Sequence, residues 1–496
     1  MKDQISSEHV AEVETDSPIN TEKVSVLNDE NVALETRIRH KFDRRILVLG
    51  TLIYLFAQID RSNMSNAVVL GMGNDIGLRG NQFNISLTLF FLTYILFEMY
   101  GLPQISHSGF SARGPRIWLS TITFGFGLVT LCTAFIENYH GLVVCRLLLG
   151  VCESGVQPGI VYAYSQFYRR HEMASRLGIK AAGASIAGAF GGLLGSGLGR
   201  IPQHGILKSW RWIFLIEGLL TLVLAVVVFA LMPGDVETSK FLNNDEREVA
   251  SRRIAQENMT TGEERMDLAT FKKALWNPNT QMTGLALIMS LLSLTSLSLF
   301  MPTLLKSGMG YSPTNAQLFS VPPYVAAAIA CVIGSFLADR LHTRGYILLT
   351  FTPLTITGFV ILATVKQAGV RYFALFIATT GAFTCSPIFL AWVSGNSAGP
   401  AVRAIVTAYA VGIANVGSII ATWTYLPGEA PYYRMGHWIN CGAACILFLA
   451  VGCNMVYLKM ENRMRMAGKR DHRLAGATEG EIGRLGHYHP EFRYTP

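Results

Sequence analysis

Charged residues are scarce in this chain. Asp, Glu, Lys and Arg make up only 15% of its 496 residues, whereas 50% of the residues are hydrophobic. This composition lies outside the range of soluble globular domains and is typical of a protein with many membrane-spanning segments. Long apolar runs alternate with short polar links, and we therefore expect an all-α polytopic membrane protein in a lipid bilayer.

The sequence also lacks the patterns that mark several other classes of protein. Its eight cysteines form no CxxC pair and lie in or at the ends of apolar runs, so we expect neither a disulfide framework nor a metal site. Ser-His-Asp arrangements, Walker loops and dinucleotide fingerprints are missing at the membrane boundaries, and we expect no enzyme and no cofactor. The net charge is +8, but the basic residues are not interleaved with stacking aromatics, which argues against nucleic-acid binding.

Hydropathy and breaker residues divide the chain into five parts. We expect a disordered N-terminal tail at about 1–45, a six-helix bundle at about 46–233 and a linker with an amphipathic helix at about 234–279. A second six-helix bundle at about 280–458 and a C-terminal tail at about 459–496 follow. The twelve expected spans lie at about 46–68, 86–106, 116–136, 142–167, 177–199, 212–232, 280–304, 316–338, 346–365, 371–394, 402–424 and 436–458.

Lys and Arg determine the expected orientation in the membrane. They gather in the two tails and in the connections after the even-numbered spans, and few occur after the odd-numbered ones. Because basic residues stay on the cytoplasmic side, we expect both termini to be cytoplasmic, and we favour the plasma membrane. Arg61 and Arg146 are the two basic residues expected inside spans.

The fourth span contains charged residues inside an otherwise apolar run. At 3.6 residues per turn, Arg146, Gly150, Glu153 and Gln157 share one helical face, with Arg146 and Glu153 about 10 Å apart. A charge inside a bilayer is costly and normally faces the bundle interior or an aqueous path. The alternative is a purely structural Arg–Glu ion pair that holds helices together. Such a pair does not require Gly, Gln and Pro-Gly on and beside the same face.

The first span holds a second charged group, Asp60 and Arg61. Adjacent helical residues point about 100° apart, so one can face a central cavity while the other faces a neighbouring helix. Spans 1 and 4 run in opposite directions, which brings Arg61 and Arg146 to similar depths. A carboxylate near mid-depth, with an arginine that can change partners, is typical of a proton relay.

The second half of the chain differs from the first. Spans 7 and 10 have uncharged interiors and offer hydroxyl and amide groups, namely Ser290, Ser293, Thr295, Ser296, Ser298, Ser386, Ser394 and Asn396. The expected cavity is therefore ionic on one side and hydroxyl- or amide-lined on the other. It suits a small organic anion, because guanidinium matches carboxylate in a two-bonded fork. For any single hydroxyl, a bond to its own helix carbonyl is the simpler alternative.

One segment resembles a motif of the major facilitator superfamily, and the likeness to this superfamily covers about residues 40 to 460. The link after span 8, GSFLADRLHTRG, is similar to the superfamily's GxxxDRxxxR loop motif through Gly334, Asp339, Arg340 and Arg344. Span 5, GASIAGAFGGLLGSGLG, has small residues four apart, which predicts close helix packing. It lacks the proline of the drug/proton antiporter branches, which weighs against multidrug efflux. The resemblance implies twelve helices in two six-helix pseudo-repeats.

Further motifs resemble the fungal allantoate permease branch of the anion:cation symporter family. These are IDRSNMSNA in span 1, RLLLGVCESGVQPG and YRRHEMASR in and after span 4, and WRWIFLIEG at the start of span 6. The resemblance implies proton-coupled symport of a small organic anion, such as allantoate, nicotinate, another vitamin or a ureido acid. Carried over by position, it implies Asp60 and Glu153 as proton carriers, Arg61 as substrate ligand, Arg146 as the partner that tunes Glu153, and Tyr94 and Asn415 as further cavity positions.

Two alternatives keep the same fold. The chain could export a secondary metabolite in a proton-coupled manner, or it could be a nutrient receptor that signals without flux; short tails argue against the receptor. We expect a monomer. The sequence leaves open whether Glu98 lies in the cavity or at the cytoplasmic mouth, and whether the sequon at Asn84 is glycosylated.

Overall fold

The computed structural model describes residues 34–107, 114–203, 207–260, 268–341, 343–397, 400–474 and 488–496. Within these ranges the chain is helical and contains no β-strand. Most of the predicted N-terminal tail lies outside the described residues.

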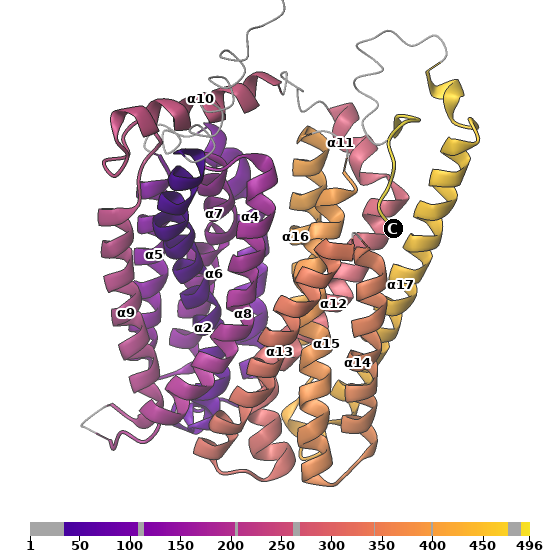
Figure 1. Cartoon of the computed structure of the whole chain (residues 1–496). Helices are drawn as coiled ribbons and strands as arrows, with labels where there is room; N and C mark the ends of the chain where they lie inside the picture. Colours follow the sequence, from indigo (N-terminus) through magenta and orange to yellow (C-terminus); the bar gives the residue numbers. More distant parts are fainter. Residues whose placement is uncertain are drawn as a thin grey trace, which may run out of the picture.

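The first half of the chain forms one group of helices, coloured indigo to magenta in Figure 1. The π-helix η1 (Asp43–Leu47) leads into the first span, and the short α3 (Met72–Asp75) follows it. The spans are α2 (Val48–Val69), α4 (Gln82–His107), α5 (Gly114–Thr133), the consecutive α6 (Tyr139–Ser154) and α7 (Val156–Ser165), α8 (Arg170–Leu198) and α9 (Ser209–Leu231).

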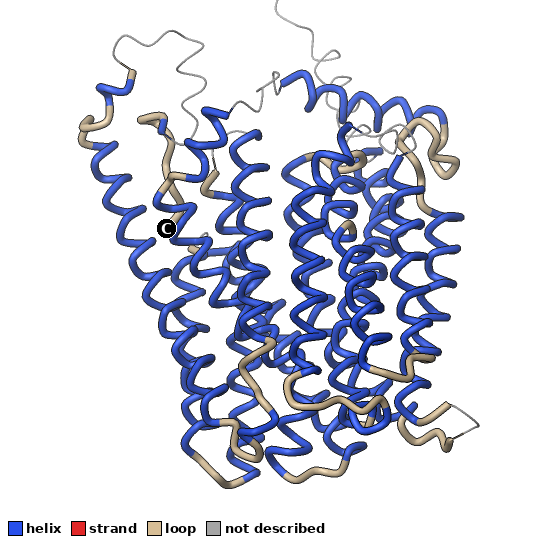
Figure 2. The backbone as a smooth tube through the Cα atoms, turned by 180° about the vertical axis from the view of Figure 1, so that it is seen from behind, coloured by secondary structure: helices blue, strands red, loops and turns tan. Residues whose placement is uncertain are grey.

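The second half forms another group, coloured orange to yellow, and the two groups lie side by side in both views (Figures 1 and 2). Its spans are α12 (Pro278–Thr303), which continues into η3 (Leu304–Gly308), α13 (Pro313–Leu341), α14 (Arg344–Thr364), α15 (Ala368–Gly395), α16 (Pro400–Ala421) and α17 (Arg434–Met466). The short η4 (Pro427–Glu429) and η5 (Asp471–Arg473) flank α17, and α11 (Leu268–Leu275) precedes α12. The helix α10 (Asn244–Thr260) lies across one end of the bundle, which we call the α10 end.

The bundle consists of twelve helical spans. Within the described ranges, nine helices are long and apolar enough to cross a membrane, and Gln82–Glu98 and Ile405–Ala421 are shorter apolar segments. The remaining span, α2, contains several polar residues, but it buries them: Asp60 is 2% exposed and Asn63 is fully buried. A helix that turns its polar side chains inward can still present an apolar face to lipid. The expected all-α, twelve-helix fold class is thereby confirmed.

The glycines of α8 allow this helix to contact two neighbours at close range. A Cβ atom at Gly191 would lie 2.5 Å from Ser62 Oγ of α2, and one at Gly192 would lie 2.6 Å from Ser320 Oγ of α13. Either distance is too short for a side chain, so only glycine permits this separation of the backbones. The close packing expected from the small residues is confirmed, and it joins α8 to a helix of each half.

Hydrogen bonds join the two halves at the end opposite α10. We call this set of contacts the seal. It comprises Gln317 Nε2 to Asn66 O at 3.1 Å, Asn84 Nδ2 to Thr422 O at 2.6 Å, Lys306 Nζ to Val69 O at 2.7 Å and Trp423 Nε1 to Thr88 Oγ1 at 3.0 Å. The amide of Asn84 is fully buried and engaged in this conformation, which leaves its sequon inaccessible to glycosylation.

Ion pairs hold the first half together at the α10 end. Arg253 Nη2 of α10 donates to Glu172 Oε1 of α8 at 2.6 Å, and Lys41 Nζ lies 2.6 Å from Glu246 Oε2 of α10. Burial opposes the ionisation of Glu246, but Lys41 and the backbone N–H of Asn243 outweigh it and lower the pKa of this carboxyl. Helix α10 is therefore fixed to the first half by charge.

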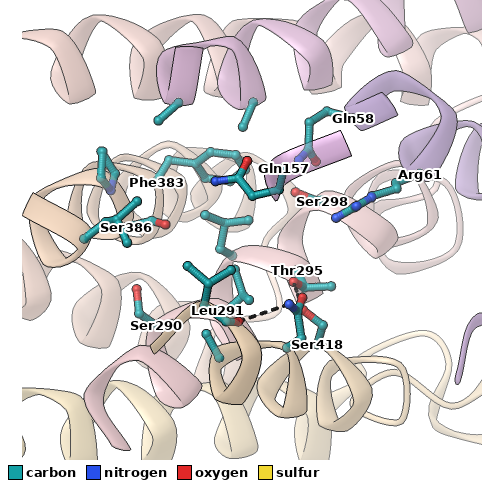
Figure 3. A pocket seen from close by; sticks show the side chains of 18 of the residues that line it. Gln58, Arg61, Gln157, Ser290, Leu291, Thr295, Ser298, Phe383, Ser386 and Ser418 are labelled. Atoms are coloured by element: carbon teal, nitrogen blue, oxygen red, sulfur yellow. Dashed lines mark hydrogen bonds between the residues drawn. The ribbon is translucent and has the colours of Figure 1, made fainter. Parts of the chain in front are cut away.

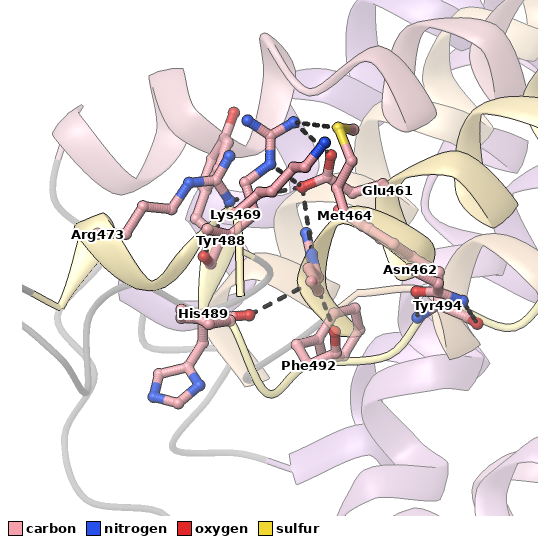
Figure 4. Close-up of polar contacts among 12 residues, drawn as sticks. Glu461, Asn462, Met464, Lys469, Arg473, Tyr488, His489, Phe492 and Tyr494 are labelled. Atoms are coloured by element: carbon pink, nitrogen blue, oxygen red, sulfur yellow. Dashed lines mark hydrogen bonds and ion pairs between the residues drawn. The ribbon is translucent and has the colours of Figure 1, made fainter. Parts of the chain in front are cut away.

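The last residues of the chain fold back onto the second half (Figure 4). Tyr494 is 4% exposed, and the carbonyl of Thr495 accepts bonds from Trp392 Nε1 at 2.8 Å and Asn396 Nδ2 at 3.0 Å. Arg465 Nη1 donates to the carbonyl of Phe492 at 2.7 Å. The stretch that we expected to be a simple tail thus packs against the α10 end of α15 and α17.

A glycine substitution tests the close packing of α5 on α9. A Cβ atom at Gly218 would lie 2.6 Å from the backbone nitrogen of Leu131, whereas one at Gly442 of α17 would have no neighbour within 4 Å. We expect Gly218→Ala to cost about 1–3 kcal/mol, because backbone atoms cannot yield as a side chain can. Gly442→Ala makes the same chemical change and should leave the melting temperature of the purified protein unchanged or slightly raised. Equal melting temperatures for the two variants would contradict this packing.

Candidate functional site

A cavity of about 190 Å³ lies between the two halves near the middle of the bundle. Helices α2, α4, α7 and α8 line one wall, and α12, α15 and α16 line the other. Figure 3 shows Arg61, Gln58 and Gln157 across the cavity from Ser290 and Leu291. The polar residues of the two walls are Tyr54, Gln58, Arg61, Ser62, Tyr94, Gln157, Lys180 and Ser185 on the first, and Ser290, Thr295, Ser298, Ser386, Asn415 and Ser418 on the second.

The cavity lies on the α10 side of the seal. On α2 the lining residues 54–62 precede Asn66 of the seal, and on α16 the lining residues 410–418 precede Thr422. Both helices start at the α10 end. The bundle is therefore closed on one side of the cavity by contacts between the halves.

A buried ion pair forms part of the first wall. Arg61 Nε donates to Glu153 Oε2 at 2.8 Å; the Glu153 side chain is fully buried, and the Arg61 side chain is 20% exposed. The guanidinium carbon of Arg61 lies 4.6 Å from the centre of the Tyr94 ring and 5.4 Å from that of Phe90. Arg61 thus contacts a carboxylate and two aromatic faces while it lines the cavity, and Tyr94 helps to position it.

The partner of Glu153 differs from our expectation. The sequence predicted that Arg146 would pair with Glu153, because the two share a helical face, but Arg61 of α2 makes this ion pair. Arg146 is 3% exposed, and its Nε atom has no hydrogen-bond partner. Helical spacing places two residues on one face of a helix; it does not determine which of them a neighbouring helix contacts.

Asp60 lies in the same buried region. Its Oδ2 atom accepts a bond from Thr130 Oγ1 of α5 at 2.8 Å, while its Oδ1 atom has no partner. Electrostatic interactions link it to Glu153, Arg146 and Arg61. Among the described residues, neither Asp60 nor Arg146 lines the cavity, but both interact electrostatically with Glu153, the partner of Arg61.

Further buried charges in the spans escaped the sequence analysis: Arg371 of α15, which is 1% exposed, and two in the first half. Lys180 of α8 is 2% exposed and lines the cavity, which corrects the expectation that Arg61 and Arg146 are the two basic residues inside spans. Glu217 of α9 is also 2% exposed, and neither of its carboxyl oxygens has a partner. Each was visible as a lone charge within an apolar helix, a signal that we applied only to spans 1 and 4.

Glu98 and Asn415 connect the two halves beside the cavity. Asn415 Nδ2 of α16 donates to Glu98 Oε2 of α4 at 3.2 Å and to the carbonyl of Val411 at 3.1 Å. Glu98 is 5% exposed, and Asn415 lines the cavity. Glu98 therefore lies next to the cavity, rather than at an exposed mouth.

The second wall is lined by hydroxyls, although only some of those predicted take part. Ser290 lines the cavity with an Oγ atom that has no partner, and Thr295 bonds to Ser418 at 3.0 Å. Among the described residues, four of the predicted ones do not line this cavity: Ser293, Ser296, Ser394 and Asn396. Asn396 instead holds Thr495, because α15 brings it to the α10 end, beyond the cavity.

The loop motif lies where α13 turns into α14, at the α10 end. A Cβ atom at Gly334 would lie 2.5 Å from Thr384 Cγ2 of α15, so this glycine permits close packing. Arg344 Nη1 donates to the carbonyl of Ala391 at 2.7 Å, and Arg344 Nη2 lies 3.3 Å from Asp339 Oδ1. Arg340 is exposed. The motif thus joins the turn to α15.

Comparison with protein families gives one match. The model described as Major Facilitator Superfamily matches residues 50–422. An uncharacterized transporter of Schizosaccharomyces pombe is 34% identical over 441 residues, which is 87% of this chain and 84% of that protein. The MFS transporter prlL of a fungal species is also 34% identical, over 457 residues that cover 89% of this chain and 88% of the relative.

Solved structures share the fold. A bacterial homolog of the human lysosomal transporter Spinster, inward-facing and unoccupied, aligns with a TM-score of 0.62 and 16% identity, over 83% of this chain and 96% of that one. A D-xylose–proton symporter aligns with a TM-score of 0.61 and 14% identity, over 82% and 96%. Both likenesses concern the arrangement of helices.

Removal of one partner tests the buried ion pair. We expect Arg61→Met to cost about 3–5 kcal/mol, because it leaves the Glu153 carboxylate buried without its donor. The double variant Arg61→Met/Glu153→Gln carries no orphaned charge and should unfold at a higher temperature than Arg61→Met alone. Thermal unfolding of the purified protein measures both.

The control for this pair is Lys208→Met, which removes a partly exposed partner of Asp75 and should cost about 0–1 kcal/mol. A double variant that is no more stable than Arg61→Met would show that the two residues do not act as a pair.

Proposed function

This chain belongs to the major facilitator superfamily and is a multi-pass membrane transporter, and we propose that it carries a small organic anion together with protons. The transport would proceed by alternating access, in which two halves rock around a central site. The observation that supports this proposal most directly is the position of Arg61, which lines the cavity and is paired with the fully buried Glu153.

This position links proton binding to anion binding. An ionised Glu153 holds Arg61 and offsets its charge, whereas a protonated Glu153 releases the guanidinium for a substrate carboxylate. Each event therefore favours the other, and such reciprocity between two ligands is what symport requires. In this proposal Arg61 binds the substrate, Glu153 carries a proton, and Tyr94 and Asn415 complete the cavity.

The balance of buried charge supports a proton in the same region. In the middle of the first half, away from both of its ends, the acids Asp60, Glu98, Glu153 and Glu217 outnumber the bases Arg61, Arg146 and Lys180. An unpaired carboxylate is costly in a medium of low dielectric constant, and protonation removes that cost. We propose that Asp60 shares the protons with Glu153, and that Arg146 balances the acid that stays ionised.

The orientation follows from the basic residues. Since Lys and Arg gather at the α10 end and in the tails, we propose that this end is cytoplasmic. The seal then faces the outside, and the cavity corresponds to an inward-facing state. We place the transporter in the plasma membrane as a monomer, with the two six-helix halves, the linker and the tails as its parts.

The motifs in spans 1, 4 and 6 support membership of the allantoate permease branch of the anion:cation symporter family. In this branch the substrate would be a carboxylate such as allantoate, nicotinate, another vitamin or a ureido acid. Proteoliposomes under an inward proton gradient, loaded in one set with buffer and in another with labelled acid, test this. Accumulation of a labelled acid supports import, loss of preloaded acid would indicate an exporter, and binding without flux would indicate a receptor.

A neutral substitution at Glu153 tests the coupling. We expect Glu153→Gln to lose accumulation of the acid under a pH gradient but to retain exchange of labelled for unlabelled acid, because a permanently neutral side chain mimics the protonated carrier. Uptake and exchange are measured in the same proteoliposome preparation. Glu248→Gln, an exposed residue of α10, is the matched control and should accumulate normally. Continued accumulation by Glu153→Gln would assign the coupling to another residue.

A further inference from the structure

Lys180 is a buried cation without a carboxylate partner. Its side chain is 2% exposed, and it lines the cavity from α8. The ammonium donates to the amide oxygen of Gln157 and lies 4.4 Å from the centre of the Tyr54 ring. Both contacts are with uncharged groups. Among the residues that the structure describes, no acid forms an ion pair with it.

The other cation of the cavity is already engaged. Arg61 uses its Nε atom on Glu153 at 2.8 Å, so its charge is offset by a buried carboxylate. An ammonium that is removed from water and surrounded by neutral partners lacks this compensation. Among the described residues that line the cavity, Lys180 is therefore the cation that has no carboxylate partner in this conformation. An incoming anion would neutralise its charge.

The two cations occupy different depths in the cavity. Lys180 lies against Tyr54, and Tyr54 precedes Arg61 by seven residues on α2, which corresponds to about 10 Å along the helix axis. Gln157, which accepts the bond from Lys180, follows Glu153 by about one turn. Lys180 is therefore displaced from Arg61 toward the α10 end.

We propose that Lys180 and Gln157 form a second anion-binding position in the cavity, which holds the carboxylate of a small organic acid while Arg61 stays paired with Glu153. This inference rests on the proposed transport of an organic anion and narrows its substrate class. Since one cation is available in this state, the substrate is a monocarboxylate. Its other end should form hydrogen bonds, because Ser290 on the opposite wall offers a buried hydroxyl without a partner.

In this arrangement, Arg61 and Lys180 have different roles. Arg61 changes partners with the protonation of Glu153, while Lys180 offers an amino group on the α10 side of that pair. An acid that leaves Arg61 when Glu153 loses its proton can then bind at Lys180, which lies closer to the α10 end.

Binding of acids to variants tests the inference. The probes are the monocarboxylates nicotinate, allantoate and pantothenate, with nicotinamide as the uncharged counterpart of nicotinate. Titration calorimetry on the full-length purified protein gives the dissociation constant of each. We expect Lys180→Met to weaken binding of the preferred acid by about 10- to 100-fold and to leave the weak binding of an uncharged amide within about twofold. Lys180→Arg should retain most of the affinity, and Lys208→Met, outside the cavity, should retain all of it.

Two outcomes would overturn the inference while the proposed function stands. The first is unchanged affinity of Lys180→Met for an acid that the wild type binds. The second is recovery of affinity in Lys180→Met/Glu98→Gln, which would show that Lys180 serves as a counter-ion for Glu98, with which it interacts electrostatically. If the wild type transports none of the acids, the proposed function fails, and this inference fails with it.

A measurement on the wild type avoids any folding defect of the variants. Lysine acetylation followed by mass spectrometry reports how readily the Lys180 ammonium reacts. We expect a saturating concentration of the preferred acid to slow acetylation of Lys180 at least about fivefold, and nicotinamide to leave it unchanged. Equal acetylation of Lys180 with and without the acid would contradict its contact with the carboxylate.

Discussion

The ion pair between Arg61 and Glu153 is the interaction on which the rest of the site depends. It joins α2 to α6 inside the first half, and its arginine also forms part of the cavity wall. Two charges can remain there only as long as each offsets the other, because neither is well solvated. Any event that neutralises Glu153 must therefore change what Arg61 contacts. The aromatic faces of Tyr94 and Phe90 restrict where the guanidinium can go.

The surrounding helices hold this ion pair beside the contact between the two halves. The glycines of α8 bring α2 and α13 close together, and the seal joins the halves on one side of the cavity. Hydrogen bonds of modest strength and glycine contacts can break and re-form without unfolding either half. On the α10 side, ion pairs and the folded-back C-terminal residues strengthen each half separately. Such a distribution of contacts is what the proposed alternating access requires, in which the halves move against each other as rigid bodies.

Much of this could be predicted from the sequence. Apolar runs of membrane length, separated by basic links, indicate an all-helical polytopic protein because a bilayer admits few other structures. Charges inside such runs were expected to face the interior of the bundle, and Arg61 and Glu153 form an ion pair there. The resemblance to known transporters added Tyr94 and Asn415, and both line the cavity. The small residues of span 5 predicted close contact because their spacing fits one helical face.

The tertiary structure alone decided which charges meet. The sequence placed Arg146 and Glu153 on one face of one helix, yet the partner of Glu153 came from α2, because rotation and depth depend on how neighbouring helices pack. The same reason explains why Lys180 lines the cavity, why Glu217 has no partner, and why Ser290 takes part in the lining while Ser293 does not. Helical periodicity determines which residues share a face; only packing between helices determines what that face meets.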